Sequence, residues 1–140
     1  GVLEKQFRRY YKEASRQGGI AGENLMVILE TRLDNVVYRS GLAATRPQAR
    51  QLVNHGHFQV NDKKVDICSF QVSAGDVVTT KERSRNALPI QHSVDTIDRV
   101  APEWMTVDKM DRKIVIDAMP TREQIDTDIK EQLIVELYSK

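Results

Sequence analysis

The sequence has few of the residues that build disulfides, metal centres and membrane spans. Its 140 residues include one cysteine, Cys68, and three histidines, so no internal disulfide and no cysteine zinc cluster can form. The longest apolar run, residues 25–29, falls far short of the roughly 18 residues that a membrane-spanning helix needs. We therefore expect no metal, no other cofactor and no membrane segment.

Composition and the first residues agree with a globular intracellular protein. The chain is 40% hydrophobic and 29% charged, with a mean hydropathy of −0.48, which is ordinary for a soluble domain. The first twenty residues contain five basic side chains but no hydrophobic segment of the kind found in secretory signals. We expect a reduced cytoplasmic location, and a length of 140 residues fits one domain or two small ones.

The charges are unevenly distributed along the chain. Residues 1–50 contain nine Lys/Arg and five Asp/Glu, a net charge of +4, whereas residues 51–100 contain six of each. Residues 101–140 contain six basic and nine acidic side chains, a net charge of −3. The overall charge of +1 hides this asymmetry. A polyanion would bind at the basic N-terminal part.

Apolar side chains at helical spacing predict helices at both ends of the chain. A first amphipathic helix spans residues 3–14 and ends at Gly18-Gly19, and a second continuous helix spans residues 23–40. A third begins at Thr45, where Thr-Arg-Pro-Gln has the form of a capping box, and ends at Gly56. A closing helical region follows Thr121, a second capping-box position, with Ile125, Ile129, Leu133 and Leu137 on one face.

Between these helices the apolar spacing changes to that of strands. A hairpin is expected from Phe58 to Val60, through the turn Asn61-Asp62, and back along Val65 and Ile67. Further strands are expected at 77–80, 104–108 and 113–117, with a mostly helical stretch from 84 to 99. Helices that flank a mixed middle indicate an α+β fold.

Many of these residues resemble the S-four family of ribosomal proteins from the small subunit. The likeness is carried by Arg32–Arg39, Gly41–Ala43, Thr45-Arg46, Gln48–Val53, His55–His57 and Val60-Asn61. The ending from Glu131 to Lys140 is also similar to the end of that family. The central part alone indicates the RNA-binding domain named after this family, which other RNA proteins also contain. The matching ends favour the ribosomal family itself, whose members have an N-terminal extension ahead of the position of Gly1.

The resemblance implies both an architecture and a function. Residues 1–31 and 121–140 would form a helical subdomain, and 32–120 an inserted α/β RNA-binding domain with a small, mainly antiparallel sheet and helices on one side. The protein would be a non-catalytic, primary binder of a folded junction in the 5′ domain of small-subunit ribosomal RNA. It would nucleate assembly, contribute to translational accuracy, contact ribosomal protein S-five and be monomeric within the ribosome, with no small-molecule substrate.

Four positions depart from the family pattern. Ser40 stands where Leu is common, Asp62 where the hairpin turn usually has Gly, and Cys68 where Pro is usual. Residues 110–112 lack the Gly that the second hairpin usually contains. Asp tolerates the left-handed conformation, so the change at position 62 is mild. The departures at Ser40 and at residues 110–112 affect loop details and leave the expected fold unchanged.

The helix that begins at Thr45 has the clearest pattern for binding RNA. Arg46, Arg50 and Asn54 recur every four residues, and two guanidiniums one turn apart near a helix N-terminus suit a phosphate backbone. The alternative is that these side chains form an ordinary solvated helix face. The family resemblance favours binding of structured RNA over that alternative. The candidate RNA-binding residues here are Arg39, Thr45, Arg46, Gln48, Arg50, Gln51, Asn54, His55, Lys63 and Lys64.

Two further groups of basic residues either bind RNA or are simply solvated. One group lies on the polar side of the first helix, and the other follows the strand at 77–80. Each is a second RNA-facing surface or simply a solvated face, while the aromatic side chains of the first helix and Trp104 are expected in the core. The candidate residues are Arg8, Arg9, Lys12 and Arg16 in the first group and Lys81, Arg83 and Arg85 in the second.

Three motifs that would indicate an enzyme are weak. Arg32-Leu33-Asp34 has the sequence of the catalytic tripeptide of pseudouridine synthases. The flanking residues, however, differ from the His before it and the Thr-Ser-Gly after it that are usual in those enzymes. His55-x-His57 lacks further ligands at a metal-binding spacing, and Cys68 lacks a catalytic partner, so a buried thiol is expected. The alternatives to a ribosomal protein are the RNA-binding fragment of an rRNA-modifying or tRNA-charging enzyme, a stress factor for stalled ribosomes, and a DNA-binding helix-turn-helix at 33–55.

Overall fold

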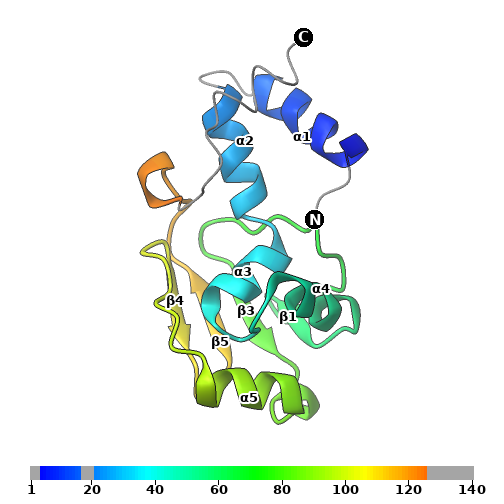
Figure 1. Ribbon diagram of the computed structural model, residues 1–140, viewed down its shortest axis with the longest axis vertical. Coiled ribbons are helices and arrows are strands. Elements are labelled where there is room, and N and C mark those ends of the chain that lie inside the picture. The colour runs from blue at the N-terminus through cyan, green and yellow to red at the C-terminus, as the bar shows by residue number, and fades with distance from the viewer. Residues whose placement is uncertain (1–3, 17–20, 126–140) are drawn as a thin grey trace. The chain divides into compact units, whose positions relative to one another are not determined.

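A computed structural model describes residues 4–16 and 21–125 of the chain. It divides into two compact units, Gly1–Glu30 with Pro120–Lys140, and Thr31–Met119 (Figure 1). Helices and an antiparallel sheet together give an α+β fold, as the sequence predicts. The predicted stop at Gly18-Gly19 and the part of the predicted closing helical region beyond Ile125 lie outside the described residues, whereas Arg122–Gln124 form a short 3-10 helix.

The first unit is built from helices. Helix α1 (Glu4–Arg16) packs on α2 (Ala21–Glu30), and the short 3-10 helix η2 (Arg122–Gln124) follows the second unit in the sequence. Leu25, Met26, Ile28 and Ile125 form the buried core of this unit. The aromatic side chains of α1 pack against that core, which confirms them as packing residues; they are Phe7, Tyr10 and Tyr11.

The single helix predicted for residues 23–40 is wrong, because the structure has two helices there. Helix α2 ends at Glu30, and α3 runs over Leu33–Ser40. Arg32 has extended backbone angles, φ −63° and ψ 142°, and forms an isolated β-bridge with Gln71. The carbonyl of Thr31 accepts a hydrogen bond of 2.9 Å from the amide of Val72. Backbone hydrogen bonds to a distant segment thus replace the helical ones at residues 31–32.

The second unit contains a five-stranded antiparallel sheet in the order β2-β1-β3-β5-β4. The strands are β1 (Phe58–Val60), β2 (Lys63–Lys64), β3 (Val77–Thr80), β4 (Met105–Asp108) and β5 (Lys113–Ile116), and the remaining helices are α4 (Arg46–Asn54), η1 (Glu82–Ser84) and α5 (Leu88–Thr96). The strands at 77–80 and in the second hairpin lie where the sequence predicts them.

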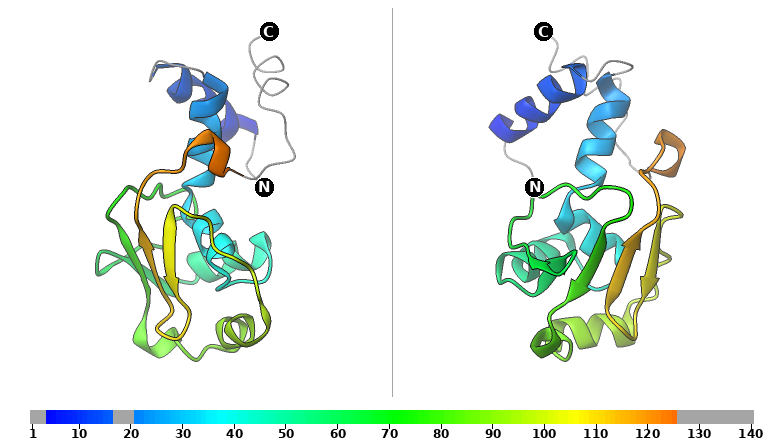
Figure 2. Two further views of the ribbon diagram at one scale, coloured as in Figure 1. Left: turned by 90° about the vertical axis from the view of Figure 1, so that its left-hand side faces the viewer. Right: turned by 180° about the vertical axis from the view of Figure 1, so that it is seen from behind.

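One face of the sheet packs on helices α3 and α4 (Figure 2). Alternate strand residues point into this core, as the period of two requires. Phe58 and Trp104 are its largest fully buried side chains, and Trp104 is 1% exposed. The expectation that Trp104 is a packing residue is therefore confirmed.

The first hairpin has the predicted turn but a shorter return strand. Asn61 and Asp62 have φ values of 51° and 68°, as a two-residue turn with left-handed positions requires. Strand β2 ends at Lys64, and Ile67 is 61% exposed, so the predicted continuation of the strand to Ile67 is wrong. After residue 65 the chain leaves the sheet because the carbonyls of Cys68 and Phe70 accept hydrogen bonds from the first amides of α3.

The ambiguous stretch from 84 to 99 is helical over Leu88–Thr96, with Pro89 in the first turn of α5. Proline is tolerated at that place because the first amides of a helix have no intrahelical partner. In the second hairpin, Arg112 has a φ of 49°. Arg112 thus adopts a left-handed conformation that favours glycine, in a hairpin where residues 110–112 contain none.

Candidate RNA-binding site

Helix α4 begins as its sequence predicts. The Thr45 hydroxyl accepts a hydrogen bond of 3.1 Å from the amide of Gln48. The Gln48 side chain accepts one of 2.7 Å from the amide of Ala44, one residue before the donor of a standard capping box. Both side chains are thereby used to fix the start of the helix. Pro47 lies in the first turn.

The outer face of α4 carries the arginines that the sequence singles out. Arg46 and Asn54 are exposed, and Arg50 is half-buried, while the opposite face is buried in the core. Arg46 donates to Oδ1 of Asn35 from Nε and Nη2, at 3.4 and 3.3 Å. Its guanidinium carbon lies 4.3 Å from the ring centre of Tyr38. The side chain of Arg46 is therefore held against α3 while remaining accessible.

Arg50 lies beside a buried carboxylate. The Nε of Arg50 is 3.9 Å from Oδ2 of Asp34. The Asp34 carboxylate also accepts two hydrogen bonds from Arg32. Its Oδ1 accepts a further hydrogen bond of 2.7 Å from the amide of Asn35. The tripeptide Arg32-Leu33-Asp34 thus forms a buried ion pair at the start of α3. Because the oxygens of the Asp34 carboxylate are occupied by these hydrogen bonds, the carboxylate is not available as a catalytic base.

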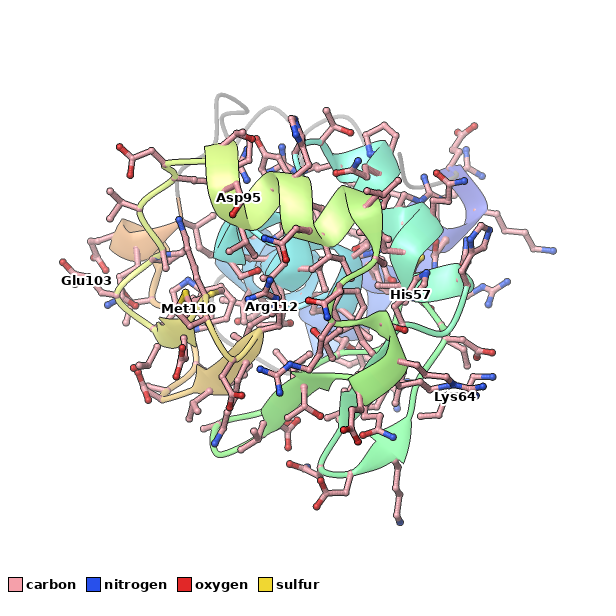
Figure 3. All side chains as sticks on the ribbon, turned by 90° about the horizontal axis from the view of Figure 1, so that it is seen from below. His57, Lys64, Asp95, Glu103, Met110 and Arg112 are labelled. Atoms are coloured by element: carbon pink, nitrogen blue, oxygen red, sulfur yellow. The ribbon has the colours of Figure 1, made fainter. Side chains whose placement is uncertain are left out.

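A second basic group gathers at the C-terminal end of α4. The rings of His55 and His57 are 6.3 Å apart, and the amide of Lys81 donates to the carbonyl of His57 at 2.9 Å. Lys64 packs so closely over Gly56 that a Cβ there would meet its Cε at 2.8 Å. Figure 3 shows His57 and Lys64 on the same side of the molecule. Residues from α4, β2 and the end of β3 thus meet in one place.

The surroundings of His57 favour its neutral form. Burial, the neighbouring His55 and the positive charge of Lys81 lower the pKa of His57 below its ordinary value of 6.5. Its Nδ1 lies 2.8 Å from the hydroxyl of Ser84. A neutral imidazole has one donor and one acceptor nitrogen, and the Ser84 hydroxyl occupies Nδ1.

The remaining candidate residues differ in how available they are. Arg8 pairs with Glu4 at 2.9 Å and Arg16 with Glu13 at 3.5 Å on the exposed side of α1, and such surface pairs are weak. Arg85 is paired with Asp111 at 3.1 Å. The others are exposed or half-buried: Arg9, Lys12, Arg39, Gln51, Lys63 and Arg83.

The sequence interpretation missed two arginines that stabilise the surroundings of the site. Arg99 donates to the carbonyls of Tyr38, Ala43 and Ala44, at 2.7, 3.1 and 3.1 Å. Arg112 is buried and donates to the carbonyls of Arg85, Lys109 and Met110 and to the side chain of Gln91 (Figure 3). Their partners include backbone groups far away in the sequence, so no local pattern could reveal these roles.

Cys68 is buried, as the sequence analysis expects. Its Sγ lies 3.4 Å from the carbonyl oxygen of Arg50 and 3.3 Å from Oδ1 of Asn54, so the single S–H can donate to either acceptor. Burial and the negative charge of Asp34 raise the pKa of the Cys68 thiol. A thiol that ionises less readily is a poor nucleophile, and Cys68 serves as packing behind α4.

Within the described residues, no cluster of three or more His, Cys, Asp or Glu is placed to hold a metal ion. His55-x-His57 accordingly has no third ligand there. Among residues 4–16 and 21–125, no helix is both long and apolar enough to cross a bilayer.

Known protein families and curated relatives match this chain over most or all of its length. Residues 31–78 match the S4 domain, and residues 1–30 match the ribosomal protein S4/S9 N-terminal domain. The small ribosomal subunit proteins uS4 of Mycolicibacterium smegmatis and Rhodococcus erythropolis are each 57% identical to this chain over 141 residues. The uS4 protein of Corynebacterium glutamicum is 54% identical. Each alignment covers 100% of this chain and 70% of the relative.

Proposed function

The chain belongs to the small ribosomal subunit protein uS4 family, and we propose that it binds ribosomal RNA chiefly through the outer face and the two ends of helix α4. It is a ribosomal protein with an S4 RNA-binding domain and is not an enzyme. The alternative of a fragment from an RNA-modifying or tRNA-charging enzyme is wrong, because the whole chain, both ends included, matches ribosomal proteins.

The observation that carries this proposal is the accessible, fixed guanidinium of Arg46 at the first turn of α4. Arg50 follows one turn later, and His55, Lys64 and Lys81 extend the basic surface from the other end of the helix. A helix N-terminus and planar guanidiniums both favour phosphate oxygens. A-form RNA presents mainly phosphates and 2′-hydroxyls to protein side chains, so this surface would recognise RNA by backbone shape.

The sequence supports further roles for the other candidate residues. The exposed cations of α1, Arg8, Arg9, Lys12 and Arg16, would form a second RNA-binding surface on the first unit. Arg39, Thr45, Gln48, Gln51, Asn54, Lys63, Arg83 and Arg85 would line or flank the α4 surface. In this assignment residues 1–31 and 121–140 form the helical subdomain, and residues 32–120 form the inserted RNA-binding domain.

In the ribosome, the proposed target is a folded junction in the 5′ domain of the small-subunit RNA. Binding two basic surfaces to neighbouring RNA helices would hold the junction in one shape, and this would nucleate assembly of the subunit. The protein would act as a monomer, contact ribosomal protein S-five and contribute to the accuracy of translation. Neutralising several phosphates makes such binding strongly dependent on salt.

Filter binding to the 5′ domain of small-subunit ribosomal RNA tests this proposal, with tRNA as competitor and a series of salt concentrations. The full chain is compared with Arg46→Ala, with Arg46→Ala/Arg50→Ala, and with Lys113→Ala. Lys113 is a half-buried lysine of β5 outside the proposed surface, so its removal controls for the loss of one positive charge. Circular dichroism verifies that each variant is folded.

We expect tight, competitor-resistant binding that is weakened by each arginine change and unaffected by Lys113→Ala. Each lost phosphate contact reduces the slope of log K against log salt by roughly 0.7–0.9. Binding no tighter than that to tRNA would contradict the proposed target. Full binding by the folded double variant would instead exclude Arg46 and Arg50 as the main contacts and assign binding to α1 or to the basic residues beyond the C-terminal end of α4, including the Lys81–Arg85 segment.

A further inference from the structure

Two guanidiniums lie over the ring of Tyr38, in the last turn of α3. The guanidinium carbon of Arg46 is 4.3 Å from the ring centre, and that of Arg99 is 4.1 Å away. Both distances are well within the range of cation–π attraction. Arg46 comes from the start of α4 and Arg99 from the loop after α5, so three separate segments meet at one half-buried aromatic ring.

The hydrogen bonds of Arg46 leave one edge of its guanidinium available. Nε and Nη2 both donate to Oδ1 of Asn35, which lies three residues before Tyr38 on the same face of α3. Within the described part of the chain, Nη1 of Arg46 makes no hydrogen bond. The Nη1–Nη2 edge is therefore able to form the paired hydrogen bonds that a phosphate accepts.

Arg99, the second arginine over the ring, is anchored by hydrogen bonds to backbone carbonyls. Its three hydrogen bonds go to the carbonyl of Tyr38 and to two carbonyls in the turn between α3 and α4. These contacts fix the end of α3 relative to the turn that leads into Arg46. The hydroxyl of Tyr38 has no hydrogen bond to any described residue, so the part of Tyr38 that acts here is its ring.

We propose that Tyr38 is a positioning residue for RNA binding, whose ring holds the guanidinium of Arg46 so that its Nη1–Nη2 edge faces an RNA phosphate. Asn35 binds the adjacent Nε–Nη2 edge of the same guanidinium, and Arg99 fixes the backbone that carries the ring. This inference rests on the proposed function of α4. An uncharged side chain thereby controls a phosphate contact without touching RNA itself.

The test uses the full chain, the 5′-domain RNA and the same salt series. The variants are Tyr38→Phe, Tyr38→Leu, Arg46→Ala and the double change Tyr38→Leu/Arg46→Ala. Tyr38→Phe keeps the ring and is the matched control, because the hydroxyl has no partner among the described residues. Fluorescence of Trp104, the single tryptophan, reports whether the second unit remains folded.

Tyr38→Phe should bind as the wild type does. Tyr38→Leu should bind about two- to fivefold more weakly, the ratio expected for one exposed cation–π contact. It should also lower the salt slope toward that of Arg46→Ala, by up to about 0.7–0.9, although no charge has been removed. In the Arg46→Ala background, Tyr38→Leu should have no further effect on affinity, since the guanidinium that the ring holds is already absent.

Different failures have different meanings. A folded Tyr38→Leu variant with wild-type affinity and slope would overturn the positioning role but leave α4 as the RNA surface if Arg46→Ala still weakens binding. A loss of equal size in the Arg46→Ala background would overturn it too, because Tyr38 would then act independently of Arg46. If wild-type binding is no tighter than binding to tRNA, both proposals fail together.

A second variant keeps the test decisive if Tyr38→Leu does not fold. Arg46→Lys leaves α3 unchanged and retains the positive charge but lacks the planar fork that stacks on a ring. It should lose about as much affinity as Tyr38→Leu would, roughly two- to fivefold. Wild-type binding by Arg46→Lys would overturn the proposal, because an unpositioned charge would then be sufficient.

Discussion

Arg32 and Asp34 are joined by two hydrogen bonds, of 3.2 and 3.1 Å, between side chains that are almost completely buried. Two residues that are close in sequence form this pair because Arg32 is extended and Asp34 lies in the first turn of α3. A buried ion pair adds little net stability by itself, but removing one partner leaves an uncompensated charge. The pair also supports Arg50, which lies on the other side of the carboxylate.

Replacing Asp34 by Asn should therefore destabilise the second unit strongly. The expected loss is about 3 kcal/mol in the free energy of unfolding, because the buried guanidinium of Arg32 loses the negative charge of Asp34, with which it shares two hydrogen bonds. Urea unfolding followed by Trp104 fluorescence measures this value. Asp66→Asn, which changes an exposed carboxylate, is the control and should alter stability little. Equal stability of the two variants would show that the Arg32–Asp34 pair is dispensable.

The stability of the second unit should fall as the solution is acidified through the titration of His57. The folded pKa of His57 lies below its ordinary value of 6.5, so between these two values the unfolded chain binds more protons than the folded one. Stability is therefore lost as pH falls from above 6.5 through the lowered pKa, by at most about 1.4 kcal/mol per pH unit for one proton.

Urea unfolding at pH values on both sides of this window measures the effect on the wild type and on His57→Asn. Asn can still form a hydrogen bond with Ser84 but does not titrate, so its stability should depend less on pH. His92→Asn, a change at an exposed histidine of α5, should retain the wild-type dependence. If His57→Asn has an unchanged pH profile, a different group is responsible for the acid sensitivity.

The thiol of Cys68 should react slowly in the folded protein. Burial and the nearby Asp34 carboxylate raise its pKa, so little thiolate is present at neutral pH, and access is restricted as well. Alkylation by iodoacetamide should be slower by roughly tenfold or more than in the same chain unfolded in urea. The assay is unambiguous because the chain has one cysteine. Equal rates in both states would contradict the buried position.

Asp62 and Arg112, two of the left-handed positions in the hairpins, should respond to glycine in opposite ways. Asp62→Gly should stabilise the protein by about 0.5 kcal/mol, because glycine adopts positive φ without steric cost. Arg112→Gly also relieves a positive φ, of 49°, yet it should destabilise by about 2 kcal/mol or more because it removes the charged hydrogen bonds of a buried guanidinium to three backbone carbonyls. Thermal unfolding of both variants tests this contrast. A stabilised Arg112→Gly would mean that backbone strain outweighs those hydrogen bonds.

Local signals in the sequence were sufficient for much of the fold. Thr45 and Gln48 predict the start of α4, because the groups that cap a helix lie within one turn of each other. Asn61-Asp62 predicts the first turn, because these residues tolerate the left-handed region. The apolar stripe of α1 predicts which aromatic side chains pack in the first unit. In each case the decisive interaction is between residues close together in the chain.

Long-range hydrogen bonds decided what the local pattern left open or suggested wrongly. The break between α2 and α3 depends on backbone bonds from residues 31–33 to residues 70–72, and the apolar periodicity across residues 23–40 contains no trace of them. The same segment ends the first hairpin earlier than its β-forming residues suggest. Pairing partners almost forty residues apart are set by the packed fold, so a helical pattern alone cannot reveal where the helix must stop.

The site divides in the same way between sequence and structure. The sequence by itself determined that α4 carries Arg46 and Arg50 on its outer face, since helical spacing fixes which side chains share a face. Only the tertiary structure decided that Tyr38, Asn35 and Arg99 surround Arg46, because Arg99 reaches the carbonyl of Tyr38 from 61 residues away. Periodicity specifies the face of a helix, whereas the neighbours of that face depend on how distant segments pack.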